Sequence, residues 1–176
     1  MKRGNELTNV NRLLSDLKTV KDLIYNDCGL DLTNLNLSTE SLEYGACSFE
    51  LNNKKIQYRM SKITPLKTGQ FVTIWQRNKD GITEPFNVLD DLDFIIIAAK
   101  KENKFGQFIF PKSVLAENGI ITKNNKEGKR GIRVYPPWDT FENKQAEKCQ
   151  TWQTKYFMTI EDENSTNKDL IRKLLF

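Results

Sequence analysis

The longest apolar run of the chain, Phe94 to Ala99 (FIIIAA), places the strongest constraint on its fold. A run of this length suits a buried strand, which we expect over Asp93 to Lys100. It is too short to cross a membrane, since a spanning helix needs roughly 18 apolar residues. The polar segment Glu102-Asn103-Lys104 and a second apolar strand, Gly106 to Phe110, come next. We therefore expect the two strands to pair as a hairpin.

Apolar periodicity predicts the remaining elements. Residues 5–26 carry apolar side chains at helical spacing, whereas the period from Tyr44 onward is two. Asn52-Asn53 is a tight-turn pair between two alternating segments, which predicts another hairpin. The further expected elements are a helix over 5–26, strands over 46–51, 55–62, 69–77 and 131–135, a short helix over 112–118, a helix from 139 or 140 to 157, and a last helical turn at 170–176.

This order of elements predicts an α+β fold, with a mainly antiparallel mixed sheet flanked by helices. We expect one domain over residues 1–176. Within it, the N-terminal helix is expected at about 5–26, the sheet core at about 44–135 and the C-terminal helices at about 139–176. A restriction-endonuclease-like arrangement stays open.

Composition excludes several classes of function. The chain has no histidine, which rules out Ser-His-Asp and Cys-His triads and His-ligated metals. Its three cysteines, Cys28, Cys47 and Cys149, are scattered without a CxxC pair, so we expect neither a disulfide framework nor a zinc site. The first residues lack the apolar stretch of a signal peptide. We expect a cytoplasmic protein without a membrane partner.

Positive charge is concentrated in two parts of the chain. Between Lys54 and Lys79 there are seven basic residues and no acidic one, and between Lys100 and Arg133 there are nine basic residues against three glutamates. The net charge of the whole chain is only +4. Such segregation creates a local field that attracts phosphate groups. The charge pattern therefore predicts nucleic acid as the class of partner.

Strand alternation places Arg59 on the face opposite Tyr58, away from the apolar side chains of its strand. We expect that face to be exposed and to continue through Lys62 and Arg77, with Trp75 among the cations. Cations on such a face hold phosphates, and aromatic rings stack on bases. The alternative is a solvated edge whose lysines oppose aggregation.

Two further patterns each have a functional and a structural interpretation. The pattern K-x-G-Q-F occurs at 67–71 and again at 104–108. It either marks two strands that begin after similar turns or brings Gln70 and Gln107 to one end of the sheet as a polar recognition surface. The string GIRVYPPWD at 131–139 has two prolines, which fix an extended backbone and present Trp138 rigidly beside Arg133. That segment is either a ligand pocket or a structural corner.

Asp93, Glu102 and Lys104 reproduce the D-x(n)-E-x-K order of Mg²⁺-dependent nucleases. In such a site the two carboxylates hold the metal, and the lysine steadies the attacking water. The context is poor, because Asn103 stands between Glu102 and Lys104 and the segment reads as a hairpin turn. These three residues are weak catalytic candidates, and Mg²⁺ is a cofactor only on this interpretation. We expect no other cofactor and no other metal.

Five strings within roughly residues 44–157 belong together. They are Lys62-Ile63-Thr64-Pro65, Gly69 to Arg77 (GQFVTIWQR), Gly106 to Lys112 (GQFIFPK), Arg133 to Trp138 (RVYPPW) and Gln150 to Gln153 (QTWQ). Together these strings resemble the MepB family. The resemblance implies a bacterial cytoplasmic protein whose namesake is encoded beside a multidrug efflux pump and the repressor of that pump. It implies no catalytic residues, so the function has to be argued from the side chains.

We expect a non-catalytic protein that binds DNA or RNA through its basic strand face. Two alternatives stay open. One is a Mg²⁺-dependent nuclease with a degenerate D-ExK site, and the other is a protein that binds a small anionic or planar ligand around Gln70, Gln107, Arg133 and Trp138. The residues expected to contact nucleic acid are Lys54, Lys55, Arg59, Lys62, Lys67, Gln70, Trp75, Arg77, Gln107, Lys112, Arg133, Tyr135 and Trp138.

Overall fold

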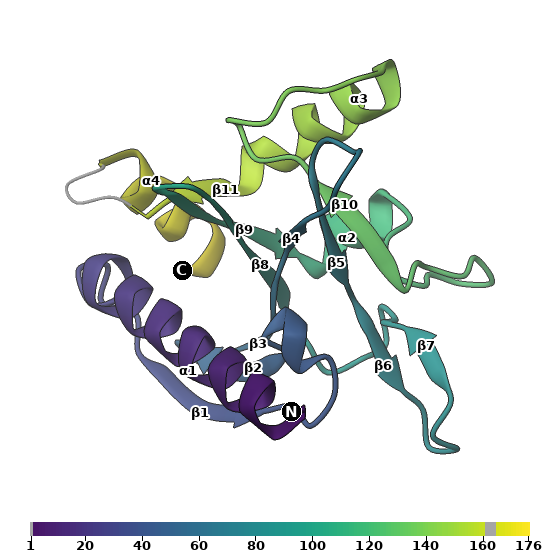
Figure 1. Ribbon diagram of the computed structural model, residues 1–176, viewed down its shortest axis with the longest axis horizontal. Helices are drawn as coiled ribbons and strands as arrows, with labels where there is room; N and C mark the ends of the chain where they lie inside the picture. The colour runs from purple at the N-terminus through teal and green to yellow at the C-terminus, as the bar shows by residue number, and fades with distance from the viewer. Residues whose placement is uncertain (1, 161–164) are drawn as a thin grey trace.

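A six-stranded sheet forms the centre of the computed structural model, which describes residues 2–160 and 165–176 (Figure 1). Its strands run in the order β1-β2-β3-β8-β9-β11, with β3 and β8 parallel and the other neighbours antiparallel. The predicted α+β fold with a mainly antiparallel sheet is confirmed. The strands are β1 Leu32–Leu37, β2 Cys47–Leu51, β3 Lys54–Met60, β8 Phe94–Lys101, β9 Lys104–Pro111 and β11 Phe157–Thr159.

Both predicted hairpins are present. β2 and β3 are joined by Asn52 and Asn53, whose φ angles of 47° and 63° lie in the left-handed region that a tight hairpin turn requires. β8 and β9 pair along their whole length, from Phe94 opposite Pro111 to Lys101 opposite Lys104. The sequence did not predict the parallel pairing of β3 with β8.

Two small sheets lie beside the large one. β4 (Lys62–Ile63), β5 (Gln70–Thr73) and β10 (Gly131–Val134) form the first, in the order β10-β5-β4. β6 (Trp75–Arg77) and β7 (Thr83–Pro85) form the second. The single strand expected over 69–77 is therefore wrong. It divides at Ile74, whose N–H donates to the carbonyl of Arg130 at 2.9 Å, so that β5 pairs with β10 and β6 pairs with β7.

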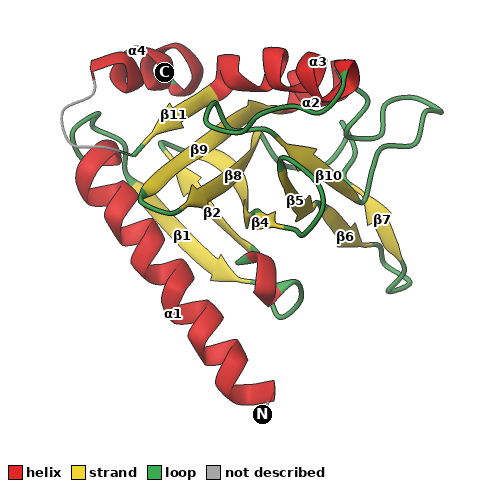
Figure 2. Cartoon of the chain, turned by 45° about the horizontal axis from the view of Figure 1, so that its top comes forward, coloured by secondary structure: helices red, strands yellow, loops and turns green. Residues whose placement is uncertain are grey.

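Helices cover one face of the large sheet. Helix α1 (Lys2–Val20) continues into the π-helical turn Lys21–Tyr25, so helical structure ends within one residue of the predicted position. Its buried side chains pack against the sheet together with Ile171 and Leu175 of α4 (Ser165–Leu175). Figure 2 shows the helices at the outside of the molecule and the strands at its centre. Residues 161–164, within the predicted C-terminal helical region, lie outside the described residues.

The opposite face of the large sheet is covered by β5, β10, α2 (Lys112–Glu117) and α3 (Lys144–Gln153). The last long helix, predicted from 139 or 140 to 157, is wrong at both ends, since α3 ends at Gln153 and Phe157 is the first residue of β11. α3 begins after Asn143, whose Oδ1 accepts the N–H of Ala146 at 2.9 Å, as an N-cap side chain does. The short 3₁₀ helices are Leu42–Tyr44 and Thr154–Tyr156.

The central position of β8 explains the long apolar run. Ile96 and Ala98 face the core beneath α1, and Ile95 and Ile97 face the core beneath β5 and β10. A strand covered on both faces has no solvent side on which polar residues would alternate. Within residues 2–160 and 165–176, no helix combines the length and apolar content that crossing a membrane requires.

Candidate functional site

Arg59, the centre of the predicted basic face, is buried. Only 6% of its surface is exposed. Its Nη1 donates to the carbonyl of Tyr58 at 2.8 Å, and its Nη2 lies 3.4 Å from the carbonyl of Trp75. Its guanidinium also lies 5.8 Å from the ring centre of Phe86. The expectation of an exposed Arg59 is wrong, because Trp75 and Phe86 cover this face of β3.

Two other cations of the predicted face are held by carboxylates. Lys55 forms an ion pair with Asp91. Nε of Arg77 donates to both carboxylate oxygens of Glu40, at 2.6 and 2.8 Å, and its guanidinium lies 5.5 Å from the ring centre of Trp75. These side chains can still meet solvent, but a phosphate would have to compete with their existing partners.

The remaining predicted strand cations are scattered. Lys62 lies over the ring of Tyr44, 4.3 Å from its centre. Lys112 donates to the carbonyl of Asp90 at 3.1 Å. Lys54 is exposed at the start of β3 and forms no ion pair with any residue that the structure describes. The structure thus does not bring these residues together on one continuous face.

The two glutamines of the K-x-G-Q-F repeat are buried separately. Gln70 accepts from the hydroxyl of Ser61 at 2.8 Å and donates to the carbonyl of Lys100 at 3.1 Å. Gln107 accepts from the hydroxyl of Tyr25 at 2.8 Å, on the α1 face of the sheet. Their exposed surfaces are 1% and 0%, so the predicted polar recognition surface is wrong. Both amides satisfy buried polar groups instead.

The nuclease-like carboxylates lie far apart. Asp93 precedes β8, where it accepts the N–H of Lys55 at 2.8 Å, and Glu102 follows the last residue of β8. An eight-residue strand spans ~26 Å, which is too far for two carboxylates to share one Mg²⁺. Asp93, Glu102 and Lys104 therefore do not form the D-ExK site. Among the described residues, no three cysteine or carboxylate side chains are grouped so that they could hold a metal ion.

The YPPW segment is a structural corner. Trp138 packs edge-on against Phe157, with ring centres 5.3 Å apart. Nε2 of Gln150 donates to the carbonyls of Pro136 and Asp139, at 3.0 and 2.8 Å. These contacts fix the turn between β10 and α3. Trp138 supports the core here, and the pocket between β10 and α3 that Arg133 lines does not include it.

Helix α3 is anchored to β10 by a buried glutamine. Oε1 of Gln153 accepts the N–H of Tyr135 at 2.8 Å, and its Nε2 donates to the carbonyl of Arg133 at 3.0 Å. These bonds extend the edge of β10 in the way that another strand would. The ring of Tyr135 is half-buried, and burial raises the pKa of its hydroxyl. Gln153 therefore sets the distance between β10 and α3.

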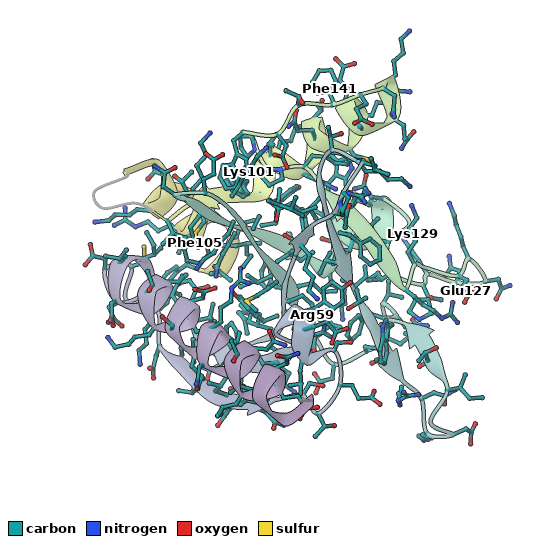
Figure 3. All side chains as sticks on the ribbon, viewed as in Figure 1. Arg59, Lys101, Phe105, Glu127, Lys129 and Phe141 are labelled. Carbon is teal, nitrogen blue, oxygen red and sulfur yellow. The ribbon has the colours of Figure 1, made fainter. Side chains whose placement is uncertain are left out.

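A pocket of about 520 Å³ lies between β10 and α3. We call it the basic pocket, because its charged lining residues are all cationic. No Asp or Glu from the described part of the chain lines it. In Figure 3 the label of Lys129 lies beside β10, whereas the buried Arg59 is labelled near the middle of the molecule. The basic pocket is defined by Lys67, Lys129, Arg133 and Lys148, with Phe71 and Trp152 as its aromatic residues.

The cations of the basic pocket are not neutralised. Arg133 is half-buried and bonds to neutral groups alone, which are the carbonyls of Thr68 and Gly69 at 3.1 and 3.2 Å and the hydroxyl of Thr64. The exposed Lys67, Lys129 and Lys148 form no ion pair with any described residue. The pocket therefore presents four positive charges to a bound anion.

Sequence reasoning found part of this pocket. Lys67 and Arg133 were predicted to contact nucleic acid, whereas Lys129, Lys148, Phe71 and Trp152 were not selected. Lys148 and Trp152 are four residues apart within the predicted helix, so helical spacing places them on one face. That spacing, combined with the YPPW segment just before the helix, was the sequence signal that could have indicated Lys148 and Trp152 as site residues.

A second, smaller pocket brings three predicted residues together. Arg59, Trp75 and Arg77 line a pocket of about 290 Å³, on the face of β2 and β3 opposite α1. It shares no lining residue with the basic pocket. Five of the thirteen predicted residues thus line one of the two pockets, and the other eight, Tyr135 and Trp138 among them, line neither.

Comparisons with known proteins match most of the chain. A family model described as MepB-like matches residues 38–159. Among solved structures, the crystal structure of MepB is similar at a TM-score of 0.72 and 32% sequence identity, over 81% of this chain and 97% of that chain. A bacterial homing endonuclease is similar at a TM-score of 0.42 and 14% identity, over 81% of this chain and 85% of that one. No curated protein sequence matches significantly.

Proposed function

The chain belongs to the MepB-like family, and we propose that it binds nucleic acid, with phosphate groups held in the basic pocket between β10 and α3. Family membership, first inferred from the sequence strings, is confirmed. It assigns no chemistry to the chain, so the proposal rests on the side chains of the pocket. The proposed site is therefore the basic pocket, and not the face of β3 that the sequence predicted.

The observation that carries the proposal is the uncompensated charge of the basic pocket. Four cations line it, and none of them is paired with a carboxylate of the described residues. Cations that already hold a protein carboxylate gain little from a phosphate, whereas free cations release counter-ions from nucleic acid when they bind it. Phosphate binding is therefore the interaction that this pocket supports best.

The aromatic residues of the pocket suit a nucleotide. Trp152 is fixed by Phe110, with ring centres 5.2 Å apart, and Phe71 packs edge-on against Tyr44 at 6.2 Å. Rings held in place in this way can stack on an unpaired base without losing further side-chain freedom. A single strand supplies unpaired bases and a duplex does not. We expect single-stranded DNA or RNA to bind more tightly than duplex DNA.

A small anionic ligand is the second candidate function. The volume of the basic pocket, about 520 Å³, lies within the range of pockets that hold small molecules. On this alternative a mononucleotide-sized anion would bind as tightly as an oligonucleotide. The ligand site first expected around Gln70, Gln107 and Trp138 is replaced by the basic pocket.

The test is a salt titration of binding to short labelled oligonucleotides, followed by fluorescence anisotropy. The test variant combines Lys67→Ala, Lys129→Ala and Lys148→Ala. The control combines Lys54→Ala, Lys79→Ala and Lys104→Ala, which are exposed lysines outside the basic pocket with the same loss of charge. Each phosphate contact contributes about 0.7 to 0.9 to the slope of log K against log[salt], so the pocket variant should lose a slope of about 2 to 3. The control should keep most of the wild-type slope.

Two results would contradict the proposal. The first is an absence of wild-type binding at low salt, and the second is an equal loss of slope in the two triple variants. Competition by a mononucleotide distinguishes the second candidate function. If the mononucleotide displaces the oligonucleotide at similar concentrations, the pocket binds a small anion, and the rest of the oligonucleotide adds nothing to the affinity.

A further inference from the structure

The smaller pocket contains a buried arginine without a counter-ion. We call it the Arg59 pocket, after the residue at its inner end. Ser48 and Gln57 stand opposite each other on β2 and β3, and Arg59 is two residues beyond Gln57, so these side chains share one face of the sheet. Trp75 and Arg77 of β6 form the other side of the pocket. This pocket plays no part in the function proposed above.

The guanidinium of Arg59 is incompletely satisfied. It bonds to one carbonyl at 2.8 Å and approaches a second at 3.4 Å, while its Nε is buried without a partner among the described residues. No carboxylate of the described residues forms an ion pair with it. Buried charges in proteins are normally paired, because leaving water without a partner is costly.

Arg59 carries its charge at neutral pH in spite of this burial. Burial lowers the pKa of its guanidinium to about 10, and the nearby Cys47 opposes this to a smaller extent. A group with that pKa is neutral in only roughly one chain in a thousand at pH 7. The side chain therefore does not escape the cost of burial by losing its proton.

The other charges of the pocket leave room for an anion. Glu40 also lines it, but both of its carboxylate oxygens are held by Arg77, at 2.6 and 2.8 Å. The pair is neutral as a whole, so one uncompensated positive charge remains, on Arg59. Ser48 and Gln57 form no side-chain hydrogen bond with a described residue and can donate to a ligand.

We propose that the Arg59 pocket binds a small oxyanion, a phosphate or carboxylate group, with Arg59 as its counter-ion and Ser48 and Gln57 as neutral donors. A planar guanidinium suits both groups, because its N–H donors match the spacing of two oxygens of one anion. The volume of about 290 Å³ is sufficient for the anion and a short organic substituent.

The test is calorimetric titration with sodium phosphate and, separately, sodium acetate, at constant ionic strength and pH 7. The background is the triple variant Lys67→Ala, Lys129→Ala, Lys148→Ala, which leaves only Arg133 of the four cations that define the basic pocket and so weakens phosphate binding there. We expect saturable binding of at least one anion, weakened at least about tenfold by Arg59→Gln. The control Arg12→Gln, which removes an exposed arginine of α1, should leave the affinity unchanged.

The two titrations also distinguish the two kinds of anion. Binding of phosphate but not acetate indicates a phosphorylated ligand, and binding of acetate but not phosphate indicates a carboxylate ligand. If Arg59→Gln does not fold, Ser48→Val tests the same pocket by replacing a donor with an apolar group, and it should weaken binding. The proposal is overturned if neither anion binds saturably, or if the pocket variants bind as the Arg12→Gln control does. Because every arm lacks three of the four cations that define the basic pocket and is compared at Arg59 or Ser48, these outcomes do not depend on nucleic-acid binding.

Discussion

Gly106 leaves the space that the ring of Phe157 fills between β9 and β11. A Cβ at this position would lie 2.1 Å from Cζ of Phe157 and 2.7 Å from the carbonyl oxygen of Met158. The backbone oxygen cannot move without breaking the pairing of the two strands. We predict that Gly106→Ala lowers the free energy of unfolding by about 1 to 3 kcal/mol, measured by urea denaturation.

Gly4 of α1 provides the control for this substitution. Nothing lies within 4 Å of the position that its Cβ would take. Gly4→Ala should therefore raise the free energy of unfolding by about 0.5 to 1 kcal/mol, because alanine favours the helix. A Gly106→Ala protein as stable as the wild type would mean that β9 and β11 tolerate a wider separation.

Single residues show where sequence reasoning succeeds and where it stops. Alternation correctly separated Arg59 from Tyr58, which lie on opposite faces of β3. It could not show that Trp75 and Phe86 cover the face of Arg59, because they belong to segments whose packing depends on tertiary contacts. Alternation indicates which side chains share a face, and whether the face is exposed depends on what packs against it.

At the scale of elements, the position of α3 depends on Gln153. Its replacement by leucine leaves the N–H of Tyr135 and the carbonyl of Arg133 without their partners, in a site that is 2% exposed. Each buried polar group left unpaired costs about 1 to 3 kcal/mol. We predict that Gln153→Leu lowers the free energy of unfolding by roughly 2 to 5 kcal/mol and weakens oligonucleotide binding, because α3 carries Lys148.

Gln145→Leu is the matched control on the same helix. Gln145 is exposed, and its Nε2 lies 3.6 Å from the sulfur of Cys149. Gln145→Leu should change the free energy of unfolding by less than about 0.5 kcal/mol. Equal destabilisation by the two leucine variants would show that the bonds of Gln153 do not anchor α3.

The elements also differ in how far local sequence determines them. The hairpin of β2 and β3 was predictable because its turn, Asn52-Asn53, and both of its strands are adjacent in the sequence. The parallel pairing of β3 with β8 joins residues such as Ile56 and Phe94, which no local pattern connects. The basic pocket lies between β10 and α3, and the prolines of the segment between them left a ligand pocket and a structural corner as alternatives without indicating the partners of the segment. Local signals thus identified many of the elements but not the division of 69–77 into β5 and β6 or the strand β11, and non-local pairing formed the pockets.

At the scale of the whole molecule, the charge pattern and the pocket positions do not coincide. The acid-free stretch from Lys54 to Lys79 predicted one basic face, but the fold distributes its cations over several places. Folding pairs Lys55 and Arg77 with Asp91 and Glu40, which come from other parts of the chain. Charge segregation in sequence predicts a charged surface only where the fold brings no opposite charge to it.

The stability of the folded chain should fall when the pH is raised above 9. Burial raises the pKa of the Cys47 thiol from 9.0 to about 12, and it also raises the pKa values of Tyr25 and Tyr58 above their usual 10.0. Below pH 9 the Cys47 thiol is protonated in both the folded and the unfolded chain, so the free energy of unfolding does not change with pH through this group. Between pH 9 and 12 the unfolded chain releases the proton and the folded chain retains it, which favours unfolding. The tyrosines act in the same direction from pH 10 upward.

Arg59 acts in the opposite direction, because its folded pKa of about 10 lies below the usual 12.5, and folding therefore gains as pH rises beyond 10. The interval from pH 9 to 10 separates the Cys47 thiol from Arg59 and the tyrosines, although the thiol of Cys28, whose pKa burial also raises above 9.0, adds a decline in the same direction. There the free energy of unfolding should decline by up to about 1.4 kcal/mol per pH unit for this group, measured by urea denaturation under reducing conditions. Cys47→Ala should make the decline shallower, and Ser48→Ala on the same strand should leave it unchanged. An equal decline in the wild type and Cys47→Ala would show that the thiol of Cys47 does not cause it.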